Sequence, residues 1–529
     1  MPEHLKALVV IVTLAAIVFA IAKPHICAVA MAEDDFVRRR NVWLGATLIA
    51  FLAHNFWLYI FATAVLFFTQ GQKEKNPLAF FFFVLFAVPM FPADISGLGV
   101  FRYLFAIHYI RLLALVVLLP WFFKLIKNPA SAKIGSLPTD KLLLGYLAVN
   151  FFLQLSSDTL TNTLRLSLFY SFLDVFLPYY VASRSLKHIR QFRDVLAAFV
   201  IAAMVMAPVA MFEAARHWLL YSSLSGVLGH PWDYGQYLDR NEALRAMGTT
   251  GQSIALGYVM AMACGLFLFL RPSVPKSRAW WLGMALLAAG LLAPASRGPW
   301  TGAAALLLAF LLTGPAPVAS VGRLFFTLLL LSPVLYLSGL GEKLIGYLPF
   351  VGDIDAENVT YRQQLIDIAI QVILENPFFG AYDFIYSPTI QELKQGDQGI
   401  IDIVNTYVAI GLSSGLVGLS LFVTFFIVSV VGVFRAMKRS SRNPNNDELH
   451  LLGRSLLAVL IATMVIILTV SSITVIPTIY WSLIGISVAY IGVCKQTFLQ
   501  QTDPASNGLQ PITARRFESK PGVTAHAPN

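Results

Sequence analysis

Long apolar runs separated by short polar stretches dominate the chain, and they predict a helical membrane protein. A helix needs about 20 apolar residues to cross the hydrocarbon core of a bilayer, and such runs recur along nearly the whole sequence. By this length criterion we predict about fourteen spans, near residues 6–22, 43–69, 77–92, 103–124, 140–156, 163–182, 194–216, 252–270, 279–296, 299–313, 322–340, 404–434, 453–472 and 475–494. The run at 43–69 is long enough for a broken pair of helices. The predicted fold class is all-α, a polytopic transmembrane helical bundle of about 12–14 spans.

Two polar stretches interrupt this pattern for longer than the other loops, at about 217–251 and 341–403. Loops of such length without a core of their own are usually lids, binding surfaces or disorder. The last residues are rich in Pro, Ser, Asn and Thr, a composition typical of disorder. We therefore predict a transmembrane domain over residues 1–499 and a disordered cytoplasmic tail over residues 500–529.

The formal net charge is +10, although only 12% of the 529 residues are charged. Soluble domains carry about 25% charged residues, so this basic excess favours the short loops of a membrane protein over a nucleic-acid-binding surface. Basic residues concentrate in the loops 124–141, 183–193 and 435–442, which fall on one predicted side. We expect that side to be cytoplasmic and the two long loops to be external. Arg38, Arg39 and Arg40 do not fit this assignment easily.

Arginines at span boundaries are the first candidates for chemistry. Arg297 lies in Ser296-Arg297-Gly298-Pro299-Trp300, at the outer end of one predicted span and directly before the next. A charge near hydrocarbon costs a few kcal/mol, and the planar guanidinium suits phosphate in a bidentate manner. Gly298 and Pro299 are expected to break the helix, so that backbone groups point at a ligand. Arg245 repeats this arrangement ahead of another span, and the alternative is that both arginines snorkel to lipid headgroups.

The 341–403 stretch contains a segment with helical periodicity. We expect a helix that starts at a capping Asn358, ends at Glu375-Asn376-Pro377, and lies on the membrane surface or on the bundle. Arg362 is expected in its first turn, where the helix dipole disfavours a cation unless an anion is held nearby. The alternative is a solvated surface arginine.

Polar residues directly before the next span complete the candidate site. Asp402 and Asn405 share a helix face if the helix starts early enough. The carboxylate is then a general base and the amide orients a hydroxyl, while the alternative for Asp402 is a helix cap. Ser296, Asp383 and Tyr407 are further substrate-binding candidates. The three cysteines lie far apart without metal-ligand spacing, so no metal or other cofactor is expected.

Together these sequence motifs resemble the O-antigen ligase and O-antigen polymerase superfamily over about residues 245–421. The resemblance lies in Ser296-Arg297-Gly298, in Arg362 ahead of an Asn-Pro-Phe-Phe-Gly stretch, and in Asn405-Thr406-Tyr407 leading into a Gly-spaced helix. It implies a bacterial inner-membrane glycosyltransferase of C-type, all-helical fold that works without a metal. The donor would be a glycan on undecaprenyl diphosphate, whose diphosphate Arg297, Arg362 and Arg245 would hold. The implied partners are this lipid-linked glycan, the lipid bilayer, a chain-length regulator and a flippase.

One departure from the family pattern bears on the reaction. Ligases that attach glycan to the lipid A core typically have a histidine where this chain has Val404, so only Asp402 or Asp383 could serve as the base. We therefore predict a polymerase of exopolysaccharide or O-antigen repeat units. The alternatives are an O-antigen ligase-type transfer to lipid A core or protein, and a transporter of lipid-linked oligosaccharide.

Overall fold

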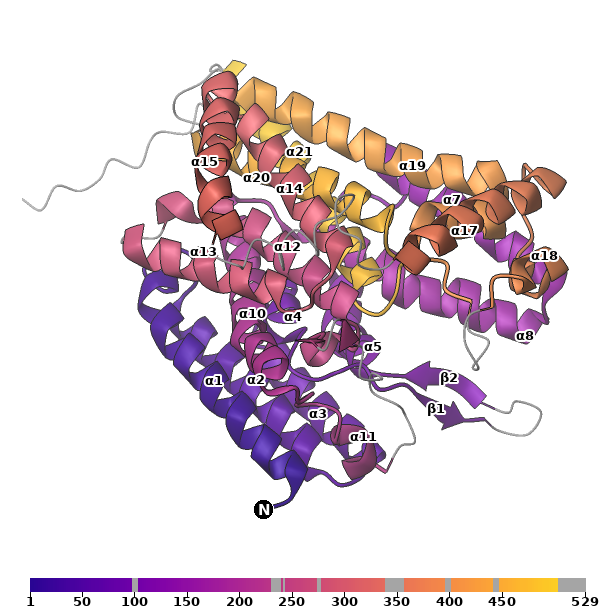
Figure 1. Ribbon diagram of the computed structural model, residues 1–529, viewed down its shortest axis with the longest axis horizontal. Helices are drawn as coiled ribbons and strands as arrows, with labels where there is room; N and C mark the ends of the chain where they lie inside the picture. The colour runs from indigo at the N-terminus through magenta and orange to yellow at the C-terminus, as the bar shows by residue number, and fades with distance from the viewer. Residues whose placement is uncertain are drawn as a thin grey trace, which may run out of the picture.

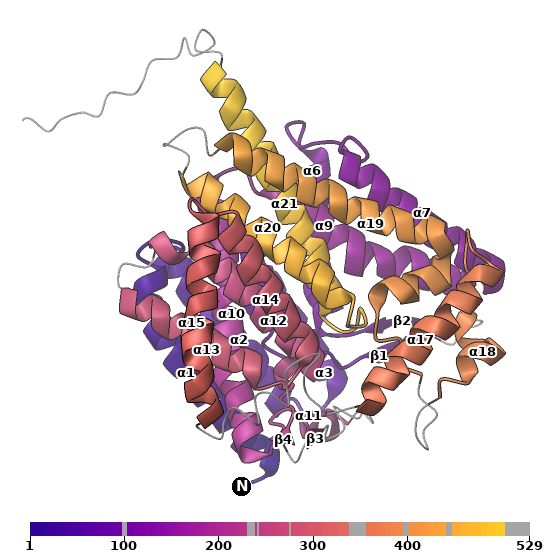
Figure 2. The same cartoon turned by 45° about the horizontal axis from the view of Figure 1, so that its top comes forward.

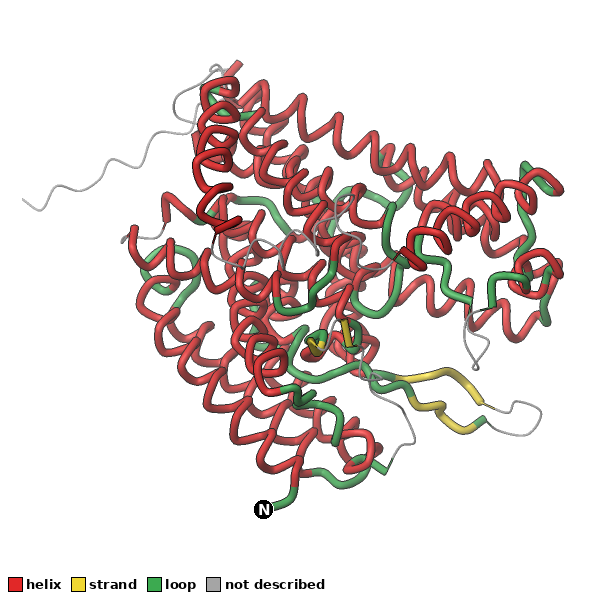
Figure 3. The backbone as a smooth tube through the Cα atoms, viewed as in Figure 1, coloured by secondary structure: helices red, strands yellow, loops and turns green. Residues whose placement is uncertain are grey.

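The computed structural model describes residues 1–97, 103–229, 239–240, 243–273, 277–337, 356–394, 401–440 and 447–502. Helices pack side by side over most of this part of the chain, and a two-stranded hairpin projects from them (Figures 1 and 3). Within the described residues, seven helical segments are long and apolar enough to cross a membrane, and further apolar helices are shorter. The chain is thus an all-α polytopic membrane protein, as predicted. The predicted tail from residue 503 onward lies outside the described residues.

The elements follow one another along the chain in three groups. The first group is α1 (Glu3–Ile26), α2 (Glu33–Leu52), α3 (Phe56–Gly71), α4 (Pro77–Val84), β1 (Ala93–Ser96), β2 (Tyr103–Ile107), α5 (Tyr109–Leu113), η1 (Ala114–Leu118) and α6 (Leu119–Lys127). The second is α7 (Pro138–Ser157), α8 (Leu160–Thr163), η2 (Leu164–Tyr170), η3 (Phe172–Phe176), α9 (Leu177–Ser185), α10 (Ile189–Arg216), α11 (Leu224–Val227), β3 (Asp239–Arg240), β4 (Ala243–Leu244), η4 (Gly248–Thr250), α12 (Ser253–Phe269) and η5 (Arg271–Ser273). The third is α13 (Ser277–Leu292), α14 (Arg297–Leu312), α15 (Pro317–Leu337), α17 (Ala356–Glu375), η6 (Phe384–Tyr386), α18 (Pro388–Gln391), α19 (Thr406–Ser440), α20 (Asp447–Ile467) and α21 (Ile476–Thr502).

The three basic loops lie at the same end of the bundle. The Arg184 guanidinium donates a hydrogen bond to the carbonyl of Ala132, which joins the end of α9 to the loop after α6. Arg193, at the start of α10, forms an ion pair with Glu448 at the start of α20. These contacts confirm that the three loops share one side, called here the basic side.

Arg38–Arg40 belong to the basic side as well. Arg39 is fully buried and forms ion pairs with Asp194 at 2.6 Å and with Glu74 at 2.9 Å. Asp194 lies next to the basic loop that precedes α10. The predicted run at 43–69 is a broken pair, since α2 and α3 are separate helices. The chain therefore crosses the bundle once more than a single long span would allow, which explains why Arg38–Arg40 did not fit the predicted topology.

Two predicted spans are not continuous α-helices. The span at 77–92 ends as a helix at Val84, and the chain then passes through turns and an irregular stretch into β1. Pro89 and Pro92 prevent a helix from continuing over the rest of the predicted span, because proline removes a backbone donor and disfavours helical geometry in the residue before it. The span at 103–124 begins with β2 and contains the π-helical turn η1.

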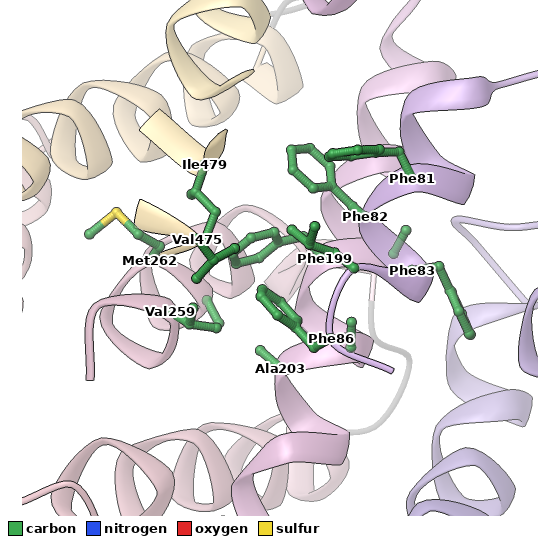
Figure 4. Close-up of a cluster of buried hydrophobic side chains, with 14 of the residues drawn as sticks. Phe81, Phe82, Phe83, Phe86, Phe199, Ala203, Val259, Met262, Val475 and Ile479 are labelled. Atoms are coloured by element: carbon green, nitrogen blue, oxygen red, sulfur yellow. The ribbon is translucent and has the colours of Figure 1, made fainter. Parts of the chain in front are cut away.

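The core forms where α4 meets α10, α12 and α21. Phe82 and Phe86 both meet the ring of Phe199 at steep angles, with centroids 5.3 and 5.7 Å apart. Figure 4 shows this cluster reaching Val259 on α12 and Ile479 on α21. Edge-to-face packing adds about 0.5–1.5 kcal/mol per aromatic pair beyond area burial, so this aromatic run fixes the middle of the bundle.

Candidate active site

Arg297 is the first residue of α14, on the side opposite the basic loops. The chain turns sharply ahead of it, where Ala295 has a left-handed φ of 46° and the buried Ser296 is the N-cap residue. Gly298 and Pro299 lie inside the first turn of α14, so the prediction that they break the helix is wrong. The N-terminus of α14 places the positive end of its dipole beside the guanidinium, which makes this turn suited to an anion.

Arg245 lies beside the same turn. Its Nε donates a hydrogen bond to the Pro294 carbonyl at 3.2 Å, and the Ala246 amide donates to the Ala293 carbonyl at 3.3 Å. The loop after α10 and the turn before α14 are thus bonded together. Two arginines predicted to hold a diphosphate are thereby brought to one place.

A buried carboxylate anchors the loop that carries Arg245. Glu213, near the end of α10, is fully buried and accepts hydrogen bonds from the backbone amides of Leu220, Met247 and Gly248 at 2.9–3.1 Å. Sequence reasoning missed Glu213. Its signal was an acidic residue at the end of an apolar run, where an ionisable group is costly unless it has partners.

The link between α20 and α21 joins this turn to the start of α19. A Cβ on Gly298 would lie only 2.6 Å from Thr469 Oγ1, so α14 packs directly on this link. The Thr406 hydroxyl donates a hydrogen bond to the Val470 carbonyl at 2.8 Å, and Ser471 Oγ donates to Asp402 Oδ1 at 3.2 Å. The N-terminus of α14 and Asp402 therefore flank one short link.

Tyr361 brings Arg362 to the same region. The Tyr361 hydroxyl donates to the Asp402 carbonyl at 2.9 Å and accepts from the Asp402 amide at 3.1 Å. Burial raises the pKa of Tyr361, so its hydroxyl stays protonated and can make both hydrogen bonds. Sequence reasoning missed Tyr361, whose position in an amphipathic helix gave no sign of this bond. Arg362 follows Tyr361 in the chain, so the turn of α17 that carries Arg362 lies beside Asp402.

Arg362 occupies an unexpected position on α17. The helix begins at Ala356, so Asn358 lies within it and Arg362 lies in the second turn, which corrects both predictions. The polar stripe of α17 runs through Gln364, Asp367 and Gln371, at i, i+3 and i+7. Arg362 lies off that stripe, on the apolar sector, and its side chain is exposed.

The Asn-Pro-Phe-Phe-Gly stretch is inserted into a break in α19. Gly415 has a non-helical backbone, with φ of 60° and ψ of −165°, and divides α19 into a short first part and a long second part. The Ala381 amide donates to the Leu412 carbonyl at 2.8 Å. The amides of Leu416 and Val417 donate to the carbonyls of residues 377 and 378 at 2.8 and 3.0 Å. We call residues 376–381 the inserted turn; it satisfies the backbone groups that the break exposes.

The remaining predicted residues are distributed around this arrangement. Asp402 and Asn405 precede α19 and do not share a helix face, because the helix begins only at Thr406. The Asn405 side chain caps α19 by accepting from the amide of Tyr407 at 2.9 Å. The Tyr407 hydroxyl donates to the Met464 carbonyl on α20.

Ser296 and Asp383 lie at different depths. Ser296 is buried where the first turn of α14 packs on Gly257 of α12, while Asp383 is exposed after the inserted turn. Burial raises the pKa of Tyr382, and the Asp158 carboxylate raises it further, which places Asp383 near the junction of α7 and α8. No contact in the described part of the chain joins Asp383 to the three arginines. Nor does that part contain a group of His, Cys, Asp or Glu side chains that could hold a metal ion.

The elements of the site gather on one side of a helical membrane protein. Figure 2 shows α11, the β3–β4 pair, α17 and α18 away from the end where α20 begins and α21 finishes. A family model described as O-antigen ligase matches residues 244–423, a range that contains every candidate residue named above. The chain is a membrane enzyme of the glycosyltransferase type. This match over residues 244–423 supports an O-antigen ligase or polymerase superfamily member. No curated protein matches it.

Proposed function

We propose that the protein polymerises repeat units of an exopolysaccharide or O-antigen carried on undecaprenyl diphosphate. The observation that supports this most strongly is the set of contacts that joins the turn at Arg245 and Arg297 to Asp402, and Asp402 to the α17 turn that carries Arg362, on the side opposite the basic loops. Three cations and one carboxylate at one face are what a transfer from a lipid diphosphate requires. The proposed location is the periplasmic face of a bacterial inner membrane, where the positive-inside rule puts the side that lacks the basic loops.

The arginines would stabilise the leaving group. Breaking the glycosidic bond to a diphosphate leaves negative charge on the departing phosphate oxygens, and fixed cations aimed at such charge are usually the largest electrostatic contribution to catalysis. Arg297 adds its charge to the positive end of α14. With three arginines in place, we propose that the reaction requires no metal ion.

Asp402 would be the general base. An acceptor hydroxyl attacks the anomeric carbon with inversion, its proton passes to the Asp402 carboxylate, and the carbon–oxygen bond to the diphosphate breaks. Undecaprenyl diphosphate leaves with the bonding electron pair. The Asp402 side chain is exposed, and its backbone is held by Tyr361, so the carboxylate is accessible on a fixed support.

Val404 favours polymerisation over ligation. This residue packs beside the apolar cluster of Tyr361, Leu365 and Ile390. It contributes an apolar contact at the position where ligases of this superfamily typically carry a histidine. The acceptor would then be another lipid-linked glycan, and a flippase that supplies it and a regulator of chain length would be the partners.

Complementation of a deletion strain tests the proposal. Arg297→Ala, Arg362→Ala and Asp402→Ala should each lower polymer yield about a hundredfold or more, as removal of a charge-stabilising donor does elsewhere, with single repeat units remaining. Arg323→Ala is the matched control, because this exposed arginine on α15 bonds only within its own helix in the described structure. Unchanged polymer with either site arginine replaced would refute the site. Full-length polymer retained on the lipid carrier would identify a ligase instead.

A further inference from the structure

Helix α17 has two apolar faces. One face, through Tyr361, Leu365, Ala369 and Val372, is buried against the protein. On the other, Ile366, Ile370 and Leu374 recur at i, i+4 and i+8 and are 45%, 52% and 69% exposed. A helix that only covered a soluble site would present polar residues on its outer face.

The outer face continues into the inserted turn. Phe378 and Phe379 follow α17 after Asn376 and Pro377 and are 65% and 55% exposed. The backbone bonds of the inserted turn to Leu416 and Val417 hold these rings at the start of the second part of α19.

The level of Leu416 relative to the bilayer follows from the length of α19. Residues 416–434 of α19 are almost wholly apolar, and Arg435 follows them. At 1.5 Å per residue this stretch is about 28 Å long, which matches a hydrocarbon core of about 30 Å. Leu416, Ile427 and Phe434 are exposed along it, as expected of a lipid-facing helix. Gly415 then marks the outer boundary of the hydrocarbon, and the rings of the inserted turn lie at that boundary.

We infer that α17 docks on the outer membrane interface, with Ile366, Ile370, Leu374, Phe378 and Phe379 inserted among the lipids. Figure 2 shows α17 crossing the direction in which α14, α20 and α21 run, as a helix lying in the interface plane does. The inserted turn joins this face to the start of lipid-facing α19, through the bonds to Leu416 and Val417, which favours lipid over a second protein as the occupant. An amphipathic helix of this kind buries its apolar face to about 5–10 Å.

This docking would fix the height of Arg362. The arginine lies on the apolar sector of α17, one turn before Ile366, so the docked helix holds its guanidinium at the level of lipid phosphates. A diphosphate anchored by a polyprenyl chain lies at the same level. This consequence for Arg362 rests on the proposed function, whereas the docking itself does not.

Spin-label accessibility measures the docking without any catalysis. The full chain, with its three cysteines replaced, is labelled at Ile370→Cys or at the matched neighbour Gln371→Cys on the polar stripe. Both are placed in nanodiscs of phosphatidylethanolamine and phosphatidylglycerol. We expect the label at 370 to collide with oxygen in preference to a water-soluble nickel chelate, and the label at 371 to show the reverse.

Two outcomes would overturn the inference. Preferential collision with the nickel chelate at both positions would mean that the outer face is in water. Dipolar broadening at 370 that disappears on dilution with unlabelled protein would mean that a second copy covers it. If the oxygen pattern holds but Arg362→Ala still makes polymer, α17 docks and the proposed function fails, so the two hypotheses are tested separately.

Discussion

Replacing Gly415 by alanine should release the inserted turn from α19. A Cβ at Gly415 would lie 2.5 Å from the carbonyl carbon and oxygen of Phe378 and from the Phe379 amide nitrogen. These are backbone atoms, which cannot rotate away as a side chain can. The backbone at Gly415, with φ of 60° and ψ of −165°, is in addition essentially restricted to glycine, at a cost of about 1–3 kcal/mol for other residues.

The magnitude follows from the bonds that the turn would lose. Three backbone hydrogen bonds, from the amides of Ala381, Leu416 and Val417, join the turn to α19. At about 1 kcal/mol net for each, detachment costs about 3 kcal/mol. This changes the equilibrium between closed and open turn on the order of a hundredfold. Because the aromatic core at α4 and α10 is remote from this break, the bundle itself should stay folded.

Hydrogen exchange on the protein in nanodiscs measures the release. In Gly415→Ala, exchange at the amides of Ala381, Leu416 and Val417 should accelerate about a hundredfold, and polymer yield in cells should fall. Gly322→Ala on α15 is the control, since a Cβ there meets nothing within 4 Å. Unchanged exchange at these amides in a folded Gly415→Ala protein would refute the reasoning, as would an equal acceleration in the control.

Three further predictions concern two residues that support the site, Glu213 and Tyr361, and the independence of the reaction from metal ions. Glu213→Gln leaves at least one of three backbone amides without its acceptor, a loss of about 1–3 kcal/mol. The KM for the lipid-linked donor should rise about tenfold, and combining Glu213→Gln with Arg245→Lys should raise KM by less than the sum of the two effects. The control Glu448→Gln on the basic side should leave KM unchanged. Full additivity of the two site variants would contradict a role of Glu213 through Arg245. Tyr361→Phe removes both bonds to the Asp402 backbone, so exchange of the Asp402 amide should accelerate about tenfold and polymer yield should fall at constant protein level. Treatment of proteoliposomes with EDTA should leave polymerisation unchanged, and activity that disappears and returns with Mg²⁺ would show that the arginines do not suffice.

The helical architecture could be predicted from the sequence because bilayer thickness sets the length of an apolar run. The long run at 43–69 proved to be α2 and α3, a possibility that its length alone indicated. The predicted span at 77–92 was wrong because its helix is shorter than its apolar run. Its apolar length suggested a full crossing, while Pro89 and Pro92 already argued for an earlier stop.

The site was predictable in its residues but less so in its geometry. Arginines at span boundaries stand out because charge near hydrocarbon is costly, and Arg245 and Arg297 do lie at one turn. Asn405 shows the limit of this approach. An asparagine directly before an apolar run has the same sequence signature whether it caps the helix or orients a substrate, and only the observed bond to the Tyr407 amide identifies the cap. The left-handed backbone at Gly415 was equally hidden, because a glycine in an apolar run is also typical of close helix packing.

Helix α17 and the inserted turn are better described as a rigid cover than as a loop. Tyr361 bonds to Asp402 ahead of α19, a Cβ on Gly411 would lie 3.1 Å from Ile373, and the inserted turn bonds to Leu416. The contacts advance along both segments together, so α17 and the first part of α19 run side by side in the same direction. A helix attached at both ends cannot open by rotating about one of them. Release of substrate past α17 would therefore require movement of the first part of α19 about Gly415, where the backbone already departs from helical geometry.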